Sequence, residues 1–188
     1  MGSKKDKTRE FIIETSYAIF AHNGFNAITM KDICEATQLS RGGLYSHFAS
    51  TQEIFEAILV KMNQKKEMNF AEEMQKGECA VTILENALLL MEDEMNHPED
   101  SLSLAMYEYT GNVATGRMEE FNKLGEDKWT SLIEYGIARG EFRPVVVEEI
   151  VNVILYVYQG VRMWSRIVKM SPETMQSITS HIRKQLVQ

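Results

Sequence analysis

The 188-residue sequence predicts an all-α protein, on three observations. Apolar residues recur at helical spacing along most of the chain, and alternation typical of strands never lasts beyond a few residues. Only three prolines are present, so long helices can form. Ser or Thr residues that can cap a helix precede several apolar runs. We therefore expect about nine helices, with a three-helix N-terminal head followed by a larger C-terminal helical domain.

The first helix is expected over residues 5–22. Ile13, Tyr17 and Phe20 form an apolar stripe there, which can pack against the rest of the head. Gly24 directly after this stretch is typical of a helix C-terminus, because glycine readily adopts the left-handed conformation that ends a helix.

Two short helices follow, each with its own N-cap. Thr29 stands three residues before Asp32, a close variant of the capping box, and predicts a helix over 29–36. Ser40 predicts the start of a second helix over 40–47 after a tight turn. Two short helices joined by about three residues form a helix-turn-helix, whose second helix can enter the major groove of DNA.

The remainder of the chain is predicted to be helical too. Ser50 and Glu53 make a full capping box, from which a long helix starts at residue 51 and connects the two parts. We place the domain boundary there, with a helix-turn-helix domain over 1–49 and a second domain over 50–188. The helices expected after the head span residues 51–75, 79–96, 101–114, 117–139, 147–169 and 172–187.

Composition argues against several classes of protein. A hydrophobic content of 44% is ordinary for a globular chain and argues against disorder. No stretch is long and apolar enough for a membrane span, and the start "MGSKKD" lacks the apolar region of a signal peptide. Cys34 and Cys79 are isolated, which suggests reduced thiols rather than a disulfide or metal site. We expect a cytoplasmic protein with no membrane partner.

Enzyme signatures are missing from the sequence. There is no HExxH, GxSxG, Walker or GxGxxG motif, and the four histidines are scattered. We therefore predict no enzymatic activity, no catalytic residues, no metal and no cofactor. The net charge of −7 is concentrated after residue 65, since residues 1–65 carry a net charge of +1. Only the N-terminal end is thus suited to a polyanion.

The helix predicted over 147–169 is apolar nearly all round, so it must be covered on more than one side. A partner subunit is one possible cover, and a single intrachain core is the other. Gly160 would let two backbones approach closely, and residues 172–187 add a narrow apolar stripe suited to helix docking. The predicted homodimer interface consists of Val153, Val157, Gly160, Met175, Ile178 and Ile182.

The stretch "SRGGLYSHF" over 40–48 contains two glycines in the first turn of a helix, where each costs about 0.5–1 kcal/mol relative to Ala. Without β-carbons, Gly42 and Gly43 allow close approach of another surface. That surface is either the preceding helix or DNA. The neighbouring polar residues, which can hydrogen-bond to phosphates or base edges, favour DNA. These residues are Ser40, Arg41, Tyr45, Ser46 and His47.

Residues 25–55, "FNAITMKDICEATQLSRGGLYSHFASTQEIF", resemble the TetR family of bacterial transcriptional regulators. The family pattern has an aromatic after a glycine, a Thr that opens the second helix, a Leu-Tyr-x-x-Phe run and a capped fourth helix. The match covers about 50 residues. The positions that carry it are Gly24, Phe25, Thr29, Ile33, Leu39, Ser40, Gly42, Leu44, Tyr45, His47 and Phe48.

The resemblance implies roles for the matching positions. Arg41, with the backbone of Gly42 beside it, would reach base edges, and Leu44 and Phe48 would be core. Thr51 stands where the family usually has a Lys that pairs with phosphate; its hydroxyl and the helix N-terminus can still meet a phosphate. Basic residues of an N-terminal arm, Lys4, Lys5, Lys7 and Arg9, can compensate for the missing charge. The phosphate-binding residues would be Thr29, Ser40, Tyr45 and His47.

The resemblance also implies a ligand-responsive regulator, most simply a homodimeric repressor released from a palindromic operator in double-stranded DNA by a small-molecule effector. Glu108 would anchor a cationic effector if it faced inward. Large, soft and aromatic residues are candidates for the effector pocket, although each can equally fill core. The candidates are Met91, Met95, Met106, Tyr107, Glu108, Phe121, Trp129 and Trp164. The alternative is a helical ligand-binding bundle or enzyme that does not act on DNA.

Overall fold

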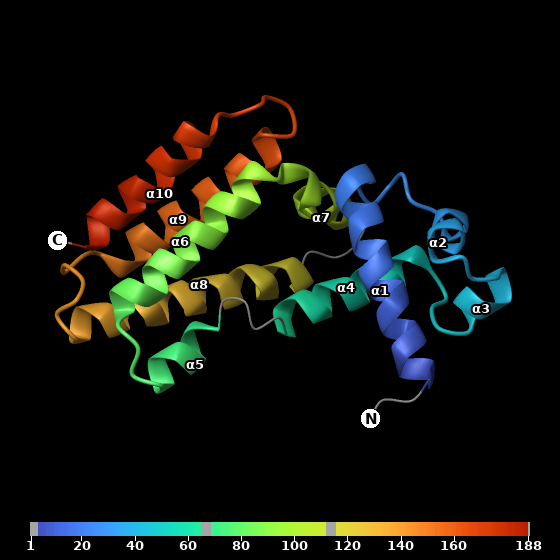
Figure 1. Cartoon of the computed structure of the whole chain (residues 1–188), viewed down its shortest axis with the longest axis horizontal. Coiled ribbons are helices and arrows are strands. Elements are labelled where there is room, and N and C mark those ends of the chain that lie inside the picture. Colours follow the sequence, from blue (N-terminus) through green and yellow to red (C-terminus); the bar gives the residue numbers. More distant parts are fainter. Residues whose placement is uncertain (1–3, 65–68, 112–115, 188) are drawn as a thin grey trace. The chain divides into compact units, whose positions relative to one another are not determined.

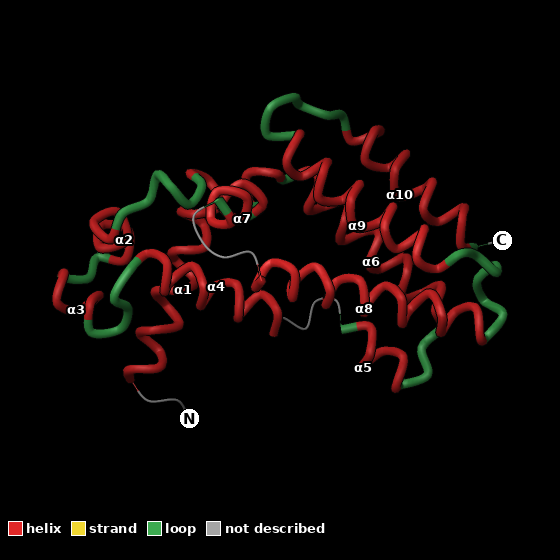
Figure 2. The backbone as a smooth tube through the Cα atoms, turned by 180° about the vertical axis from the view of Figure 1, so that it is seen from behind, coloured by secondary structure: helices red, strands yellow, loops and turns green. Residues whose placement is uncertain are grey.

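A computed structural model of the chain describes residues 4–64, 69–111 and 116–187 (Figure 1). Every regular element in these ranges is a helix, and Figure 2 shows helices and loops without a strand there. The predicted all-α class is confirmed. The helices are α1 (Lys4–Asn23), α2 (Met30–Thr37), α3 (Arg41–Tyr45), α4 (Thr51–Gln64), α5 (Phe70–Gln75), α6 (Ala80–Asn96), α7 (Ser103–Thr110), α8 (Gly116–Ala138), α9 (Val147–Trp164) and α10 (Pro172–Leu186), with a short 3₁₀ helix over Pro98–Asp100.

The described ranges contain ten α-helices where about nine were predicted, because the helix expected over 51–75 is two elements. α5 has its own N-cap, in which the Asn69 side chain accepts a hydrogen bond from the amide of Glu72 at 3.4 Å. Residues 65–68 lie outside the described residues. The helix expected over 147–169 also ends earlier, at Trp164, where the Ser165 hydroxyl donates to the carbonyl of Val161 at 2.7 Å.

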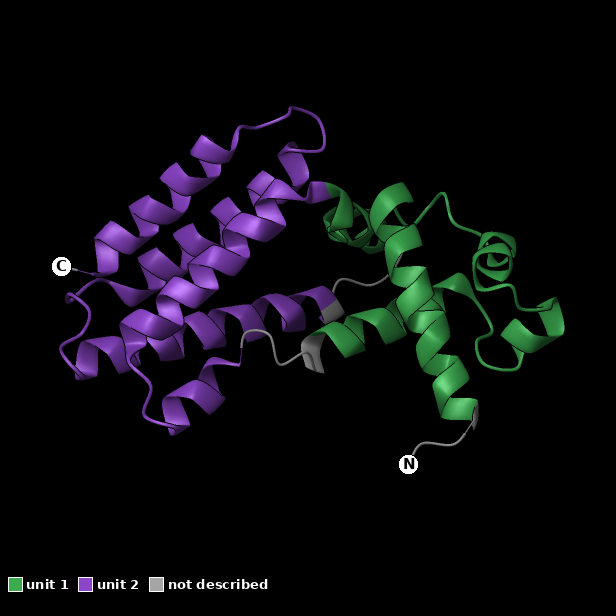
Figure 3. Cartoon of the chain, in the orientation of Figure 1, with its two compact units in different colours: residues 1–65, 99–114 green, residues 66–98, 115–188 purple. Residues whose placement is uncertain are grey.

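The chain divides into two compact units (Figure 3). Unit 1 comprises residues 1–65 and 99–114, and unit 2 comprises residues 66–98 and 115–188. The boundary predicted at residue 49 falls inside unit 1, because α4 packs along α1. α7 also belongs to unit 1, although the chain on both sides of it belongs to unit 2.

Unit 1 is built on α1, which packs against α2, α4 and α7. Its core contains a cluster of four aromatic rings from three helices and the turn after α1. The Phe20 and Phe55 rings meet edge to face at 5.1 Å, and the Phe25 and Tyr109 rings at 5.2 Å. Such geometry is favourable beyond the area that it buries.

Unit 2 is built on α6, which packs against α8, α9 and α10. The facing sides of these helices supply one continuous apolar core. Trp129 of α8 is 5% exposed and meets the ring of Phe70 edge to face at 5.1 Å. α10 begins as predicted, with Ser171 as N-cap and Pro172 in the first turn.

Candidate nucleic-acid interface

α2 is fixed at its start by the predicted capping box. The Thr29 hydroxyl accepts from the amide of Asp32 at 3.4 Å, and the Asp32 carboxylate accepts from the amide of Thr29 at 2.8 Å. The same carboxylate accepts from the Thr29 hydroxyl at 2.6 Å. These hydrogen bonds, chiefly that from the Thr29 side chain, lower the pKa of Asp32 below its usual 3.8. The Thr29 hydroxyl, predicted to bind phosphate, is therefore already hydrogen-bonded within the N-cap of α2.

The turn between α2 and α3 is tight. Gln38 adopts the left-handed conformation with φ of 56°, ends α2 and reverses the chain within three residues. α3 then starts from Ser40, whose hydroxyl accepts from the amide of Gly43 at 3.1 Å. Leu44 and Phe48 are buried, as the resemblance implied, so they attach α3 to the rest of unit 1.

α3 is shorter than the predicted 40–47. It ends at Tyr45, because the amide of His47 bonds to the carbonyl of Leu44, three residues back, at 3.0 Å. The Ser46 hydroxyl donates to the carbonyl of Gly43 at 2.7 Å and is thus engaged within the helix.

The two glycines differ in their surroundings. A β-carbon at Gly42 would meet nothing within 4 Å, so packing against α2 does not explain this glycine. A β-carbon at Gly43 would lie 3.2 Å from the Ser40 hydroxyl oxygen and 3.9 Å from the β-carbon of Leu39. Gly43 is therefore explained by the helix's own cap. Gly42 leaves an open surface at the first turn, which a DNA backbone can approach.

The exposed polar groups predicted for DNA contact lie on or beside α3. Arg41 is exposed at its first position, and the Tyr45 side chain is 51% exposed at its last. His47 is half-buried, and its Nδ1 atom is buried without a hydrogen-bond partner among the described residues. Thr51, half-buried, is the first residue of α4.

The start of α4 departs slightly from a full capping box. The Ser50 hydroxyl accepts from the amide of Glu53 at 3.1 Å, as predicted. The Glu53 carboxylate accepts from the amide of Ala49 at 2.7 Å, one residue before the cap. Both contacts fix the end of the loop that follows α3.

The basic N-terminal residues lie on a helix rather than on an extended arm. Lys5 and Lys7 are exposed in the first turns of α1, and the side chain of Lys4 lies outside the described residues. The Arg9 guanidinium lies 4.5 Å from the centroid of the Phe48 ring. This cation–π contact places a positive charge close to the end of α3.

Ion pairs link α4 to α1. Lys61 donates to the carboxylates of Glu10 and Glu14, the latter at 2.8 Å. Partial burial disfavours the charged ammonium, but the two hydrogen bonds outweigh it and raise the pKa of Lys61 above 10.5. Sequence reasoning missed this contact, because no local pattern pairs residues about 50 positions apart.

Comparison with known proteins agrees with this arrangement. Residues 12–58 match the model of the family described as bacterial regulatory proteins, tetR family. The HTH-type transcriptional regulator YfiR of Bacillus subtilis (strain 168) is 28% identical over 148 residues, which cover 75% of this chain and 71% of YfiR. The HTH-type transcriptional repressor KstR2 of Mycobacterium tuberculosis (strain CDC 1551 / Oshkosh) is 23% identical over 147 residues, covering 77% and 74%.

The chain belongs to the TetR family and is a DNA-binding transcriptional regulator. A TetR-family regulator from Agrobacterium tumefaciens has the same fold, with a TM-score of 0.82 at 15% identity, covering 98% of this chain and 100% of that one. Within the described ranges of the regulator, no helix is long and apolar enough to cross a membrane.

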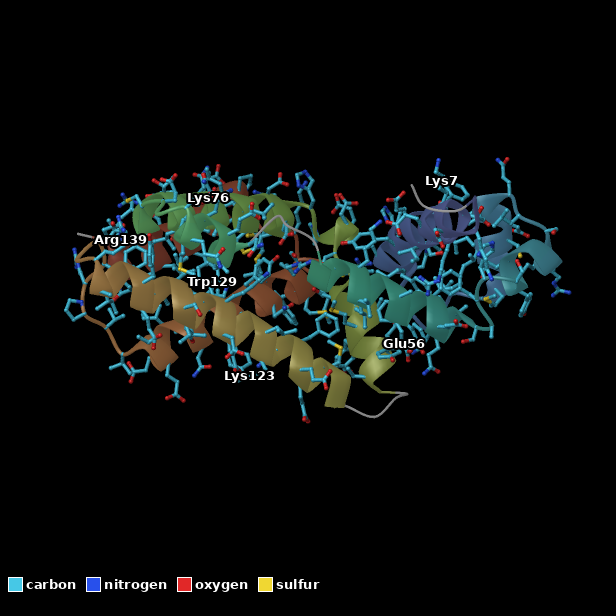
Figure 4. All side chains as sticks on the ribbon, turned by 90° about the horizontal axis from the view of Figure 1, so that it is seen from below. Lys7, Glu56, Lys76, Lys123, Trp129 and Arg139 are labelled. Carbon is cyan, nitrogen blue, oxygen red and sulfur yellow. The ribbon has the colours of Figure 1, made fainter. Side chains whose placement is uncertain are left out.

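The predicted effector residues are divided between the two units. Met91, Met95 and Trp129 lie in the apolar core of unit 2, and Figure 4 labels Trp129 on α8. Phe121 is half-buried on α8, whereas Trp164 is 55% exposed at the end of α9. Of the five predicted effector residues in unit 2, three therefore share one core, Phe121 is half-buried, and Trp164 lies at the surface.

The other three predicted effector residues lie on α7 in unit 1. Met106 is half-buried and Tyr107 is 70% exposed. The Glu108 carboxylate accepts a hydrogen bond from the amide of Asn26 at 2.8 Å, so it contacts the regulator's own backbone. Nothing in the sequence indicated this contact, because the two residues are 82 positions apart.

The predicted dimer residues also divide into two groups. Val153 is 44% exposed, Val157 is half-buried, and a β-carbon at Gly160 would meet nothing within 4 Å. Met175 and Ile182 are instead buried in the core that α10 shares with α6, because the apolar stripe of α10 faces inward. Ile178 is half-buried beside that core.

Proposed function

We propose that the regulator is a cytoplasmic homodimeric repressor that leaves a palindromic operator when it binds a small-molecule effector. The observation that supports this way of binding DNA is the open space at Gly42, in the first turn of α3 and next to the exposed Arg41. Each protomer inserts α3 into the major groove of one half-site, and the two-fold axis of the dimer matches the two-fold axis of the operator.

Within this mode each group has a distinct part. Arg41 hydrogen-bonds to a base edge, most favourably the O6 and N7 atoms of guanine. Gly42 allows the backbone of α3 to approach the groove closely. Tyr45 and the start of α4 at Thr51 bind phosphates, which fixes the register without selecting sequence. His47 is an adjacent supplementary donor. The exposed Ser46 hydroxyl already donates to the carbonyl of Gly43, so it can only accept a hydrogen bond from DNA.

The outer side of α9 supports the dimer. Val153, Tyr156, Gly160 and Trp164 recur at spacings of three and four residues, so they share one helix face. Three of these residues are large, with exposed fractions of 44%, 63% and 55%, and the glycine between them lies in open space. A second copy of α9 covers this stripe, and the small residue at its centre permits close helix contact.

The core of unit 2 is the proposed effector site. Methionine side chains adapt to ligands of different shape, and Met91 and Met95 lie there with Trp129. The effector acts only through a higher affinity for the conformation that does not fit the operator. The alternative function, a helical bundle or enzyme that ignores DNA, is not supported by the similar proteins, which are transcriptional regulators. We propose no enzymatic activity.

A gel-shift titration against DNA from upstream of the regulator's own gene tests operator binding. Arg41→Ala should weaken operator binding by about 1–3 kcal/mol and relax the preference at one base pair of each half-site. Arg143→Ala is the matched control, because this exposed arginine of unit 2 loses the same charge away from α3. Equal affinity of wild type and Arg41→Ala for operator and random DNA would contradict base reading by α3.

Analytical ultracentrifugation tests the dimer. Gly160→Leu should weaken association, because the leucine side chain holds the two copies of α9 apart while meeting open space within one protomer. Gly116→Leu is the control, since a β-carbon there also meets nothing within 4 Å but lies on α8. A wild-type regulator that sediments as a monomer at micromolar concentration would refute this interface.

A further inference from the structure

The segment containing α7 is built into the DNA-binding unit. The Tyr17 hydroxyl of α1 donates to the carbonyl of Asp100 at 3.1 Å. The Tyr109 hydroxyl of α7 donates to the Glu56 carboxylate of α4 at 2.8 Å, and Figure 4 labels Glu56 on α4. Leu102, at the start of α7, is fully buried. α7 is thus a fixed part of the head, although the chain on either side of it runs into unit 2.

One carboxylate of α7 lies directly on the turn between α1 and α2. The Asn26 amide donates to Oε2 of Glu108 at 2.8 Å. Gly24 has φ of +81°, and a β-carbon there would lie 2.5 Å from the same oxygen. The glycine therefore does more than end α1, because it also makes room for the carboxylate.

This turn leads directly into α2. Thr29, the N-cap of α2, follows Asn26 by three residues. In the same turn, the Phe25 ring packs edge to face on the ring of Tyr109, with 5.2 Å between the ring centroids. Glu108 and Tyr109, adjacent on α7, thus hold the turn by one polar and one aromatic contact.

We propose that Glu108 is a positioning residue for operator recognition. Its carboxylate fixes the backbone of the α1–α2 turn, and through α2 it fixes the direction in which α3 presents Arg41 and Gly42. Glu108 itself does not touch DNA. The proposal requires that the regulator binds DNA specifically, and it is independent of the effector.

A positioning role predicts a specific defect. Binding to random DNA depends on the total positive charge near the backbone, whereas binding to operator requires α3 to be aligned with base edges. Loss of the acceptor at position 108 should therefore lower operator affinity and leave random-DNA affinity nearly unchanged. A residue that only stabilises the fold would affect both affinities together, through the fraction of folded protein.

The experiment compares Glu108→Met with Glu108→Gln, which have similar length but differ in retaining an oxygen acceptor. Affinities for DNA upstream of the regulator's gene and for random DNA are measured well below the melting temperature. Hydrogen exchange of the Asn26 amide is followed by NMR. Glu119→Met is the control, since this exposed carboxylate on α8 lies in unit 2.

For Glu108→Met we expect about tenfold weaker operator binding, unchanged random-DNA binding and faster exchange at Asn26, in line with the loss of a hydrogen bond to a charged acceptor. Glu108→Gln should recover most of the operator affinity. Operator affinity that stays at the wild-type value in Glu108→Met, or falls in parallel with random-DNA affinity, overturns the proposal. If the wild-type protein itself binds this DNA no better than random DNA, the proposed operator recognition is wrong. That result is distinct from failure of the Glu108 proposal, in which wild type prefers operator and Glu108→Met does not differ from it.

Discussion

Unit 1 and unit 2 hold their helices by different means. In unit 1, α2 and α3 have eight and five residues, and hydroxyl groups of Thr29 and Ser40 cap their first turns. In unit 2, α6 and α9 have 17 and 18 residues, and neither has a side-chain hydrogen bond at its N-cap. They are held by the apolar core on one face of each helix.

The difference follows from what each unit must leave exposed. Helices shorter than about 12 residues are not stable alone, because the first turn costs more entropy than its hydrogen bonds recover. In the proposed binding mode α3 cannot bury its outer face in the protein, so it depends on its cap and on Leu44 and Phe48. α6 and α9 have wide apolar faces and no cap from their own N-cap side chains, although the amide of Ala80 at the start of α6 donates to the Glu141 carboxylate. α10 combines both, with a Ser171 cap and a buried stripe.

The largest expected effect comes from the core of unit 2. Trp129→Ala should lower the free energy of unfolding by about 3–5 kcal/mol, because it removes a large buried side chain that packs on Phe70 in the apolar core. Urea denaturation followed by circular dichroism measures the loss. Leu89→Ala is the control, since Leu89 is 63% exposed on α6. Similar losses for the two variants would contradict the description of unit 2 as core-dependent.

A smaller effect is expected at α3, where one substitution should raise the stability of the fold and lower the affinity for operator. Gly42→Ala should raise the stability by about 0.5–1 kcal/mol through helix propensity, because its β-carbon meets open space in the protein. The same variant should bind operator more weakly, since the added methyl group occupies the surface that we propose faces DNA. Melting temperature and operator affinity, measured at two salt concentrations, check the two signs.

Gly43→Ala sharpens this test. Its β-carbon would lie 3.2 Å from the Ser40 hydroxyl oxygen, so the cap must shift and part of the propensity gain is lost. We therefore expect Gly43→Ala to melt below Gly42→Ala. Normal operator binding by Gly42→Ala would show that this glycine has no role in DNA contact.

The sequence predicted the head well because its signals are local. Thr29 with Asp32, Ser40, and the glycine after α1 each act within four residues, so their hydrogen bonds can be anticipated from spacing alone. The alternative explanations for Gly42 could not be separated by spacing, because both require an approaching surface. Only the open space around its β-carbon favours DNA over α2.

The roles that the sequence left open depend on contacts between distant residues. Glu108 was a candidate ligand anchor, and its bond to the amide of Asn26 spans 82 positions. Met175 and Ile182 were candidate dimer residues, because a periodic stripe does not indicate whether its partner is α6 or a second chain. The pocket residues are equally ambiguous, since methionine and tryptophan fill cores as readily as they line cavities.

The smallest expected effect tests the cap of α2 through its pH dependence. Hydrogen bonds, above all from the Thr29 side chain, lower the pKa of Asp32 below 3.8 in the folded protein. A carboxylate whose pKa falls on folding stabilises the fold above its unfolded pKa, and this contribution disappears as the pH drops through the folded pKa.

Asp32→Asn should therefore lower stability slightly near neutral pH, because the amide oxygen is a weaker acceptor than the carboxylate. The difference from wild type should persist while the pH stays above 3.8, the ordinary pKa, and should shrink as the pH falls below it, through the lowered pKa of folded Asp32. Urea denaturation midpoints across this range measure it. Glu35→Gln is the control, since it removes a charge from the exposed side of α2 at the Lys31 pair without touching the cap. A constant difference at all pH values would mean that the cap acts through shape alone and not through the charge of Asp32.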